Sequence, residues 1–267
     1  MLDHFSNQAS GLIGLGCQPS PRLVAMVSHG DEQAELPLLW QLCVSLVNFG
    51  YSVTVLDATM TESETNPGLQ QLLENALWAQ DSLSGTPAWT VLPSAQGIQT
   101  LLEVSLAQAR SLYPLGALLP AEGIVILYCN VEAMAALIGD WHTEPLLAVS
   151  PTKRSLLTGY AALKRLLITG ELKPTIVNML GQQNLAVAAL QTTASAGLGE
   201  CAKRFLGHEL KTLDVVEQLA DVAPCDAVQR LALRLLERAV PLGAPAPMSQ
   251  LRRTSSTGHF PQLAGSH

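Results

Sequence analysis

Aromatic residues are scarce in this chain, at 4% of 267 residues, so it offers no platform on which the bases of a single-stranded nucleic acid could stack. Basic residues are in the minority, with 15 Lys and Arg against 22 Asp and Glu, and a net charge of −7 argues against nonspecific nucleic-acid binding. The sequence has no run near the roughly 20 apolar residues of a membrane-spanning helix and no signal-peptide pattern at its amino end. We therefore expect a cytoplasmic protein.

Cysteines are also few, and their spacing excludes two kinds of architecture. The five cysteines are odd in number and scattered, with no CxxC or Cys/His ligand spacing: Cys17, Cys43, Cys129, Cys201 and Cys225. A zinc site or a disulfide framework is therefore not indicated, and we expect no bound metal. What the chain does have is 48% hydrophobic residues and enough length for one large, well-buried α/β domain.

The first ordered part of the chain reads as a βαβ unit. Leu23 to Val27 is a short apolar run typical of a parallel strand buried on both faces. We expect a helix from Leu36 to Phe49, stopped by Gly50, and a second strand from Tyr51 to Asp57. In nucleotide-binding proteins built this way, phosphates sit in the loop after the first strand, at the amino end of the helix.

That loop is poorly suited to phosphate. It has one glycine, Gly30, and no lysine, whereas a phosphate cradle needs several glycines and a Lys next to a Ser or Thr. It carries Asp31, Glu32 and Glu35, and one like-charge contact at about 4 Å in a partly screened site costs on the order of 4 kcal/mol. His29 lies alone in the loop, where a polar structural role is more common than a catalytic one.

The rest of the chain continues the alternation of strands and helices. We expect strands at 89–92, 124–128, 146–149, 173–177 and 208–216, and helices at 68–78, 97–112, 153–167, 182–206 and 226–240. This order predicts a doubly wound, mostly parallel sheet of seven or eight strands with helices on both faces. A flexible segment, 1–21, would precede this domain of residues 22–240, and a disordered tail, 241–267, would follow it.

The strand, loop, helix and acidic strand end together resemble the MinD/ParA class of deviant Walker A ATPases. Laid on that class's loop, Gly30 holds the position of the signature Lys, Glu35 that of the main Lys, and Leu36-Pro37 that of the Ser/Thr pair. Further segments similar to the class follow in order: Leu56-Asp57-Ala58-Thr59, Asn66-Pro-Gly-Leu69, Ser155 to Lys164, and Thr175-Ile-Val-Asn178. The resemblance covers most of the chain and implies a P-loop NTPase-like fold.

The resemblance also implies a vestigial nucleotide site. Its residues would be Ser28, His29, Gly30, Asp31, Glu32, Glu35, Asp57 and Asn178. In the class, Asp57 would position metal and water and Asn178 would contact a base, while the acid expected after the strand at 124–128 is replaced by Cys129-Asn130. We therefore expect a pseudo-ATPase with no catalytic residue, no cofactor and no nucleotide-bridged homodimer. The alternative is a divergent ATP- and Mg-dependent switch whose missing Lys comes from a partner subunit.

The amino-terminal segment suggests a pathway. Gln8, Ala9 and Leu12 match a segment by which flagellar-number regulators of the FlhG, FleN or YlxH type stimulate a signal-recognition-particle-like GTPase, although Asn7 and Ile13 depart from it. The resemblance implies protein partners such as that GTPase or switch-complex proteins, and control of flagellar number, placement or assembly. A MinD-like scaffold for exopolysaccharide secretion or pilus placement is the alternative.

The last expected helix, Asp226 to Val240, has one apolar stripe opposite several arginines. Packing on the sheet is the simpler reading of such a stripe. Members of the class also use an amphipathic carboxyl-terminal helix at the membrane. The alternative interpretation is therefore peripheral contact of this helix with the inner membrane or the cell pole.

Overall fold

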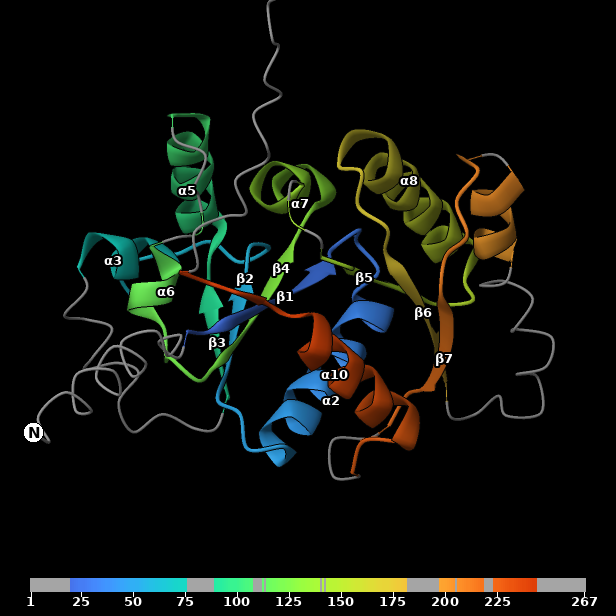
Figure 1. Ribbon diagram of the computed structural model, residues 1–267, viewed down its shortest axis with the longest axis horizontal. Helices are drawn as coiled ribbons and strands as arrows, with labels where there is room; N and C mark the ends of the chain where they lie inside the picture. Colours follow the sequence, from blue (N-terminus) through green and yellow to red (C-terminus); the bar gives the residue numbers. More distant parts are fainter. Residues whose placement is uncertain are drawn as a thin grey trace, which may run out of the picture.

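A computed structural model describes residues 20–75, 89–107, 112, 114–139, 141, 143–181, 197–204, 206–218 and 223–243. Its centre is an eight-stranded sheet in which seven strands run parallel, in the order β3-β2-β4-β1-β5-β6-β7 (Figure 1). The strands are β1 (Arg22–Val27), β2 (Val53–Asp57), β3 (Trp89–Pro93), β4 (Ile124–Cys129), β5 (Leu146–Val149), β6 (Thr175–Leu180), β7 (Thr212–Val216) and β8 (Val240–Pro241). The predicted fold class is confirmed.

Helices cover both faces of this sheet (Figure 1). They are α2 (Glu32–Asn48), α3 (Leu69–Glu74), α5 (Ala95–Ala107), α6 (Leu115–Leu118), α7 (Val131–Ile138), α8 (Lys153–Thr169) and α10 (Asp226–Arg238), and residues 197–204 are also helical. One hydrophobic core lies between the sheet and α3, α5, α7 and α8, and a second lies between the sheet and α2 and α10.

The continuous apolar runs of the central strands follow from these two cores. In β1, Leu23, Ala25 and Val27 enter the first core, whereas Val24 and Met26 enter the second. Alternate side chains of a strand point to opposite faces, so a strand with a core on each side must be apolar at every position. The strand interiors could therefore be read directly from the sequence.

One expected boundary was wrong in a way that matters for the site. The helix expected to start at Leu36 begins at Glu32, because the N–H groups of Ala34 and Glu35 already donate to the carbonyl of Asp31, each at 2.9 Å. Acidic side chains are favourable in a first helical turn, so Glu32 and Glu35 belong to α2 and not to the loop. Pro37, expected near the start of the helix, lies inside it.

Other elements also differ from expectation. The strand expected to end at Val177 continues to Leu180, which places Asn178 inside β6. The short helices α6 and α7 were not predicted; Asn130 caps α7 by accepting a hydrogen bond from the N–H of Ala133. The helices expected at 68–78 and 97–112 end within the described residues at Glu74 and Ala107.

The carboxyl end of the domain returns to its first strand. β8 pairs antiparallel with the start of β1, Leu242 is fully buried, and its N–H donates to the carbonyl of Pro21 at 2.7 Å. The packed chain thus extends to Leu242, past the domain end expected at Val240. Residues 1–19 and 244–267, including Gln8, Ala9 and Leu12, lie outside the described residues.

The apolar stripe of α10 is buried in the second core. Val228, Leu231, Ala232, Leu235 and Leu236 are its buried members, so the helix packs on the sheet. In the part of the chain that the structure describes, no helix has the length and apolar character to cross a membrane.

Candidate functional site

The candidate site is the loop between β1 and α2, at the carboxyl ends of the strands. The N–H of Ser28 donates to the carbonyl of Cys129 at 2.8 Å, which continues the pairing of β1 with β4 into the loop. Gly30 then adopts a φ of +86°, a left-handed conformation that side-chain-bearing residues rarely adopt. The turn at Gly30 brings the N–H groups of His29 and Asp31 toward one point, as in the backbone nests that bind anions.

The group bound by these two N–H groups is a side chain of the protein itself, the Glu35 carboxylate. Glu35 is fully buried, and its Oε1 accepts hydrogen bonds from the N–H of His29 at 2.9 Å and the N–H of Asp31 at 3.0 Å. Glu35 projects from the first turn of α2 back over the loop, so the side chain at the position of the class's main Lys occupies the loop's own donors. A carboxylate held by converging N–H groups is the arrangement that phosphate would otherwise make.

Tyr128 and His29 complete the surroundings of this carboxylate. The Tyr128 hydroxyl, at the end of β4, donates to Oε2 of Glu35. Burial raises the pKa of Tyr128 well above its ordinary range, and the Glu35 and Asp57 carboxylates raise it further. His29 Nε2 lies 3.5 Å from Oε1 of Glu35 and donates to the carbonyl of Ala148 at 2.6 Å. The neutral phenol and the imidazole therefore both face the same buried carboxylate.

Asp31 joins the loop to the residues just before α8. Its Oδ2 accepts from the Ser150 hydroxyl at 2.8 Å and from the Ser150 N–H at 3.1 Å. Thr152 caps α8, and His29 Nδ1 lies 2.9 Å from the Thr158 hydroxyl on the same helix. The loop is thus fixed to the amino end of α8 by two separate side chains.

The remaining predicted residues divide into two groups. Asp57 lies beside Tyr128 in the sheet register, but its Oδ1 is held by the N–H and hydroxyl of Thr59, at 2.9 and 2.6 Å. Asn178 is buried in β6 and donates through Nδ2 to Asp214 at 2.9 Å, with no hydrogen bond to the loop. Glu32 is exposed on the outer side of α2. The structure therefore brings His29, Asp31, Glu35 and Asp57 together and leaves Glu32 and Asn178 outside.

The sequence reading missed a further carboxylate that acts in the same way. Glu62 is buried, and its two oxygens accept from the N–H groups of Gln96 at 2.7 Å and Gly97 at 2.8 Å, at the amino end of α5. The same carboxylate lies 3.4 Å from the N–H of Gln70 in the first turn of α3. Glu62 stands in a polar connection, and no local pattern marks it as a cap for two distant helices. Tyr128 was missed because it reads as the last residue of an apolar strand.

Comparisons with known proteins agree with this architecture. No protein-family model matches the chain, and no curated protein matches its sequence. Solved structures do match it. The MinC:MinD cell division protein complex of Aquifex aeolicus is 11% identical, with a TM-score of 0.52 over 83% of this chain and 98% of that chain.

Two other solved structures are similar to the same extent. The cell division ATPase MinD of Pyrococcus furiosus is 15% identical, with a TM-score of 0.50 over 81% of this chain and 98% of its own. Cobyrinic acid a,c-diamide synthase of Mycobacterium smegmatis, solved with ADP and magnesium, is 17% identical, with a TM-score of 0.50 over 84% of this chain and 100% of its own. At such identities the likeness shows the fold alone, and the doubly wound α/β fold of this chain is similar to that of these three structures.

Proposed function

We propose that this protein is a catalytically inactive, MinD/ParA-like regulatory or scaffold protein that acts through protein partners. The observation that carries the proposal is the Glu35 carboxylate on the N–H groups of His29 and Asp31. A phosphate entering the loop would have to displace the Glu35 carboxylate. Because Glu35 is held next to the loop by the first turn of α2, its carboxylate competes with phosphate at a high effective concentration. If it failed to displace Glu35, it would meet like charge at close range.

The other groups near the loop also fit a nucleotide with magnesium poorly. The segment from Ser28 to Glu35 has no lysine, and Asp57 is engaged by Thr59 in its own turn. Within the described residues, no group of three His, Cys, Asp or Glu side chains is arranged to hold a metal ion.

Calorimetry tests the proposal directly. We expect no heat of binding when the protein is titrated with ATP or ADP up to millimolar concentration, with or without magnesium. The Glu32→Ala variant, which alters an exposed acid of the same helical turn, should be equally silent. Micromolar, magnesium-dependent binding by the wild-type protein would contradict the proposal and favour the divergent ATP switch.

We propose control of flagellar number, placement or assembly as the pathway to examine first. Its support is the match of Gln8, Ala9 and Leu12 to the partner-activating segment of flagellar-number regulators. Deletion of the gene should change the number or position of flagella, and a Gln8→Ala/Leu12→Ala version should not restore them. Normal flagella combined with altered secretion or surface attachment would instead favour the exopolysaccharide or pilus scaffold.

A further inference from the structure

The outer face of α8 exposes two large apolar side chains. Leu157 is 62% exposed and Ile168 is 60% exposed, and Ala161 and Lys164 lie between them at spacings of four, three and four residues. Residues at these spacings share one face of a helix, so the four side chains form a single stripe. We call it the α8 stripe.

The charge of α8 differs from that of the whole chain. The helix carries Lys153, Arg154, Lys164 and Arg165 and no acidic residue, in a chain whose net charge is −7. Lys153, Arg154 and Lys164 make no ion pair with any residue that the structure describes. Positive charge that is available to an acidic ligand therefore lies within the α8 stripe, at Lys164, and beside it, at Lys153 and Arg154.

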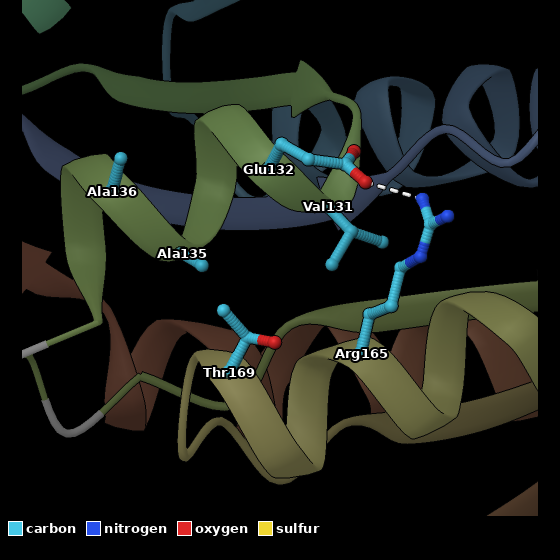
Figure 2. A pocket seen from close by; sticks show the side chains of 6 residues that line it. All are labelled: Val131, Glu132, Ala135, Ala136, Arg165 and Thr169. Carbon is cyan, nitrogen blue, oxygen red and sulfur yellow. Dashed lines mark hydrogen bonds and ion pairs between the residues drawn. The ribbon is translucent and has the colours of Figure 1, made fainter.

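A pocket of about 420 Å³ opens beside the α8 stripe, between α7 and α8 (Figure 2). Val131, Ala135 and Ala136 of α7 give it an apolar lining. Arg165 and Thr169 line it from α8, and each directly follows a residue of the stripe in sequence. Small residues keep the two helices close, since a side chain added at Gly170 would meet Ala135 Cβ at 3.2 Å.

One ion pair crosses the pocket. Figure 2 shows Glu132 of α7 and Arg165 of α8 extended toward each other and bonded. Their side chains are 61% and 63% exposed, and an ion pair this exposed contributes only about 0–1 kcal/mol. A carboxylate from another molecule could therefore replace Glu132 on the Arg165 guanidinium at little cost, with bidentate geometry available.

We propose that the α7–α8 surface is a docking site for an acidic, amphipathic helical segment of a partner protein. Apolar side chains of that segment would cover the α8 stripe and fill the pocket, while its carboxylates would bind Lys164 and Arg165. The proposal rests on the proposed function, because it names the surface and the chemistry of a partner for a protein that acts through partners. The concave pocket beside the α8 stripe can accommodate a side chain of a partner protein, whereas a flat lipid surface would not fill it.

The undescribed ends of this chain are poor candidates for the same place. Residues 244–267 contain Arg252 and Arg253 and no acid, and residues 1–19 contain only one acid, Asp3. Neither end has the run of carboxylates that the positive charge within and beside the stripe calls for. These two segments therefore match the charge of the surface less well than an acidic segment of a partner protein does.

A displayed library of random 16-residue peptides, selected on the full-length protein, tests this proposal. Selected peptides should be net negative, with Leu, Ile or Phe at helical spacing, and synthetic copies should bind the wild-type protein at least tenfold more tightly than a Lys164→Glu/Arg165→Glu variant. Binding should weaken similarly in Leu157→Ser/Ile168→Ser. The control is Arg230→Glu/Arg234→Glu on α10, which reverses exposed positive charge elsewhere and should leave binding unchanged.

Several results would overturn the docking site. These are enrichment of neutral or basic peptides, no enrichment at all, or equal binding to the wild-type protein and the α8 variants, given that their circular dichroism shows a native fold. Binding to vesicles of anionic phospholipid that the α8 variants lose would assign the surface to a membrane instead. None of these results depends on nucleotide, so the docking site and the inactivity of the loop can fail separately.

Discussion

At the scale of single residues, Glu35 receives two backbone N–H groups and the Tyr128 hydroxyl in a fully buried position. We predict that Glu35→Ala lowers the free energy of unfolding by about 2–5 kcal/mol, because buried donors lose a charged acceptor. Urea denaturation measures the change. Glu32→Ala is the matched control, since Glu32 is exposed in the same turn, and it should stay within about 0.5 kcal/mol of the wild type.

The same variant should reveal what the loop would bind without its carboxylate. Phosphate should raise the stability of Glu35→Ala more than that of the wild-type protein, because only in the variant are the N–H groups of His29 and Asp31 open to an anion. The difference between the two proteins removes the general stabilisation by such salts. Equal gains would mean that the loop is not an anion site occupied by Glu35.

A second residue, Gln41 of α2, should be replaceable with a gain in stability. It is fully buried, and neither its Nε2 nor its Oε1 has a hydrogen-bond partner in the described part of the chain. We predict that Gln41→Leu, which keeps the volume, raises the free energy of unfolding by about 1–3 kcal/mol. Gln71→Leu is the control: Gln71 accepts the N–H of Gly68 at 2.8 Å, so its loss should destabilise the protein in the same urea assay.

At the scale of elements, the sequence was sufficient to predict a strand where burial on both faces makes every position apolar. The six residues of β4 are all buried, and five of them were expected as a strand from their apolar run alone. The sequence was not sufficient to predict α7. This helix has eight residues, which are too few turns for a helical periodicity of apolar residues to be recognised. The start of α2 was misplaced because Glu35 looked like a loop acid, and only the fold shows that its partners are the loop's own N–H groups.

The site was therefore predictable in composition and not in geometry. Sequence reasoning placed Asp31 and Glu35 near one another and took their charge as a barrier to phosphate. It had no means of finding Tyr128, which is in β4, or Ser150, which follows β5, because both lie far from the loop in sequence.

Helix α10 offers a test of its role in the core. Leu231 is 2% exposed within the second core, whereas Leu233 on the same helix is 49% exposed. We predict that Leu231→Ala lowers the free energy of unfolding by about 2–5 kcal/mol, through lost burial and the cavity left behind. Leu233→Ala should change it by less than about 0.5 kcal/mol. Similar small effects for both variants in urea denaturation would mean that α10 is detached in solution.

At the scale of the whole molecule, buried acids should make the protein sensitive to alkali. Burial raises the pKa of Cys43 from its ordinary 9.0 to about 12, and raises those of Cys129 and Tyr128 further. The unfolded chain releases these protons at lower pH than the folded one, so the stability is complete below pH 9 and falls as pH rises toward 12.

Each such group steepens the fall by about 1.4 kcal/mol per pH unit. Urea midpoints measured between neutral pH and pH 11 should therefore drop faster for the wild type than for Cys43→Ala. A parallel decline of the two proteins would show that Cys43 ionises equally easily in the folded and unfolded states.

The pairing of β8 with β1 affects how the protein is made. β4 covers the whole of one side of β1, while among the described residues the other side pairs with β5 at Met26 and with β8 at Arg22 and Leu23. A ribosome completes β1 long before β8, so the amino half of the central strand keeps an open edge until β8 has been made. Such an edge can pair with other chains. Val240 and Pro241 thus close this edge of β1. A nascent or truncated chain without β8 is the form most prone to aggregation.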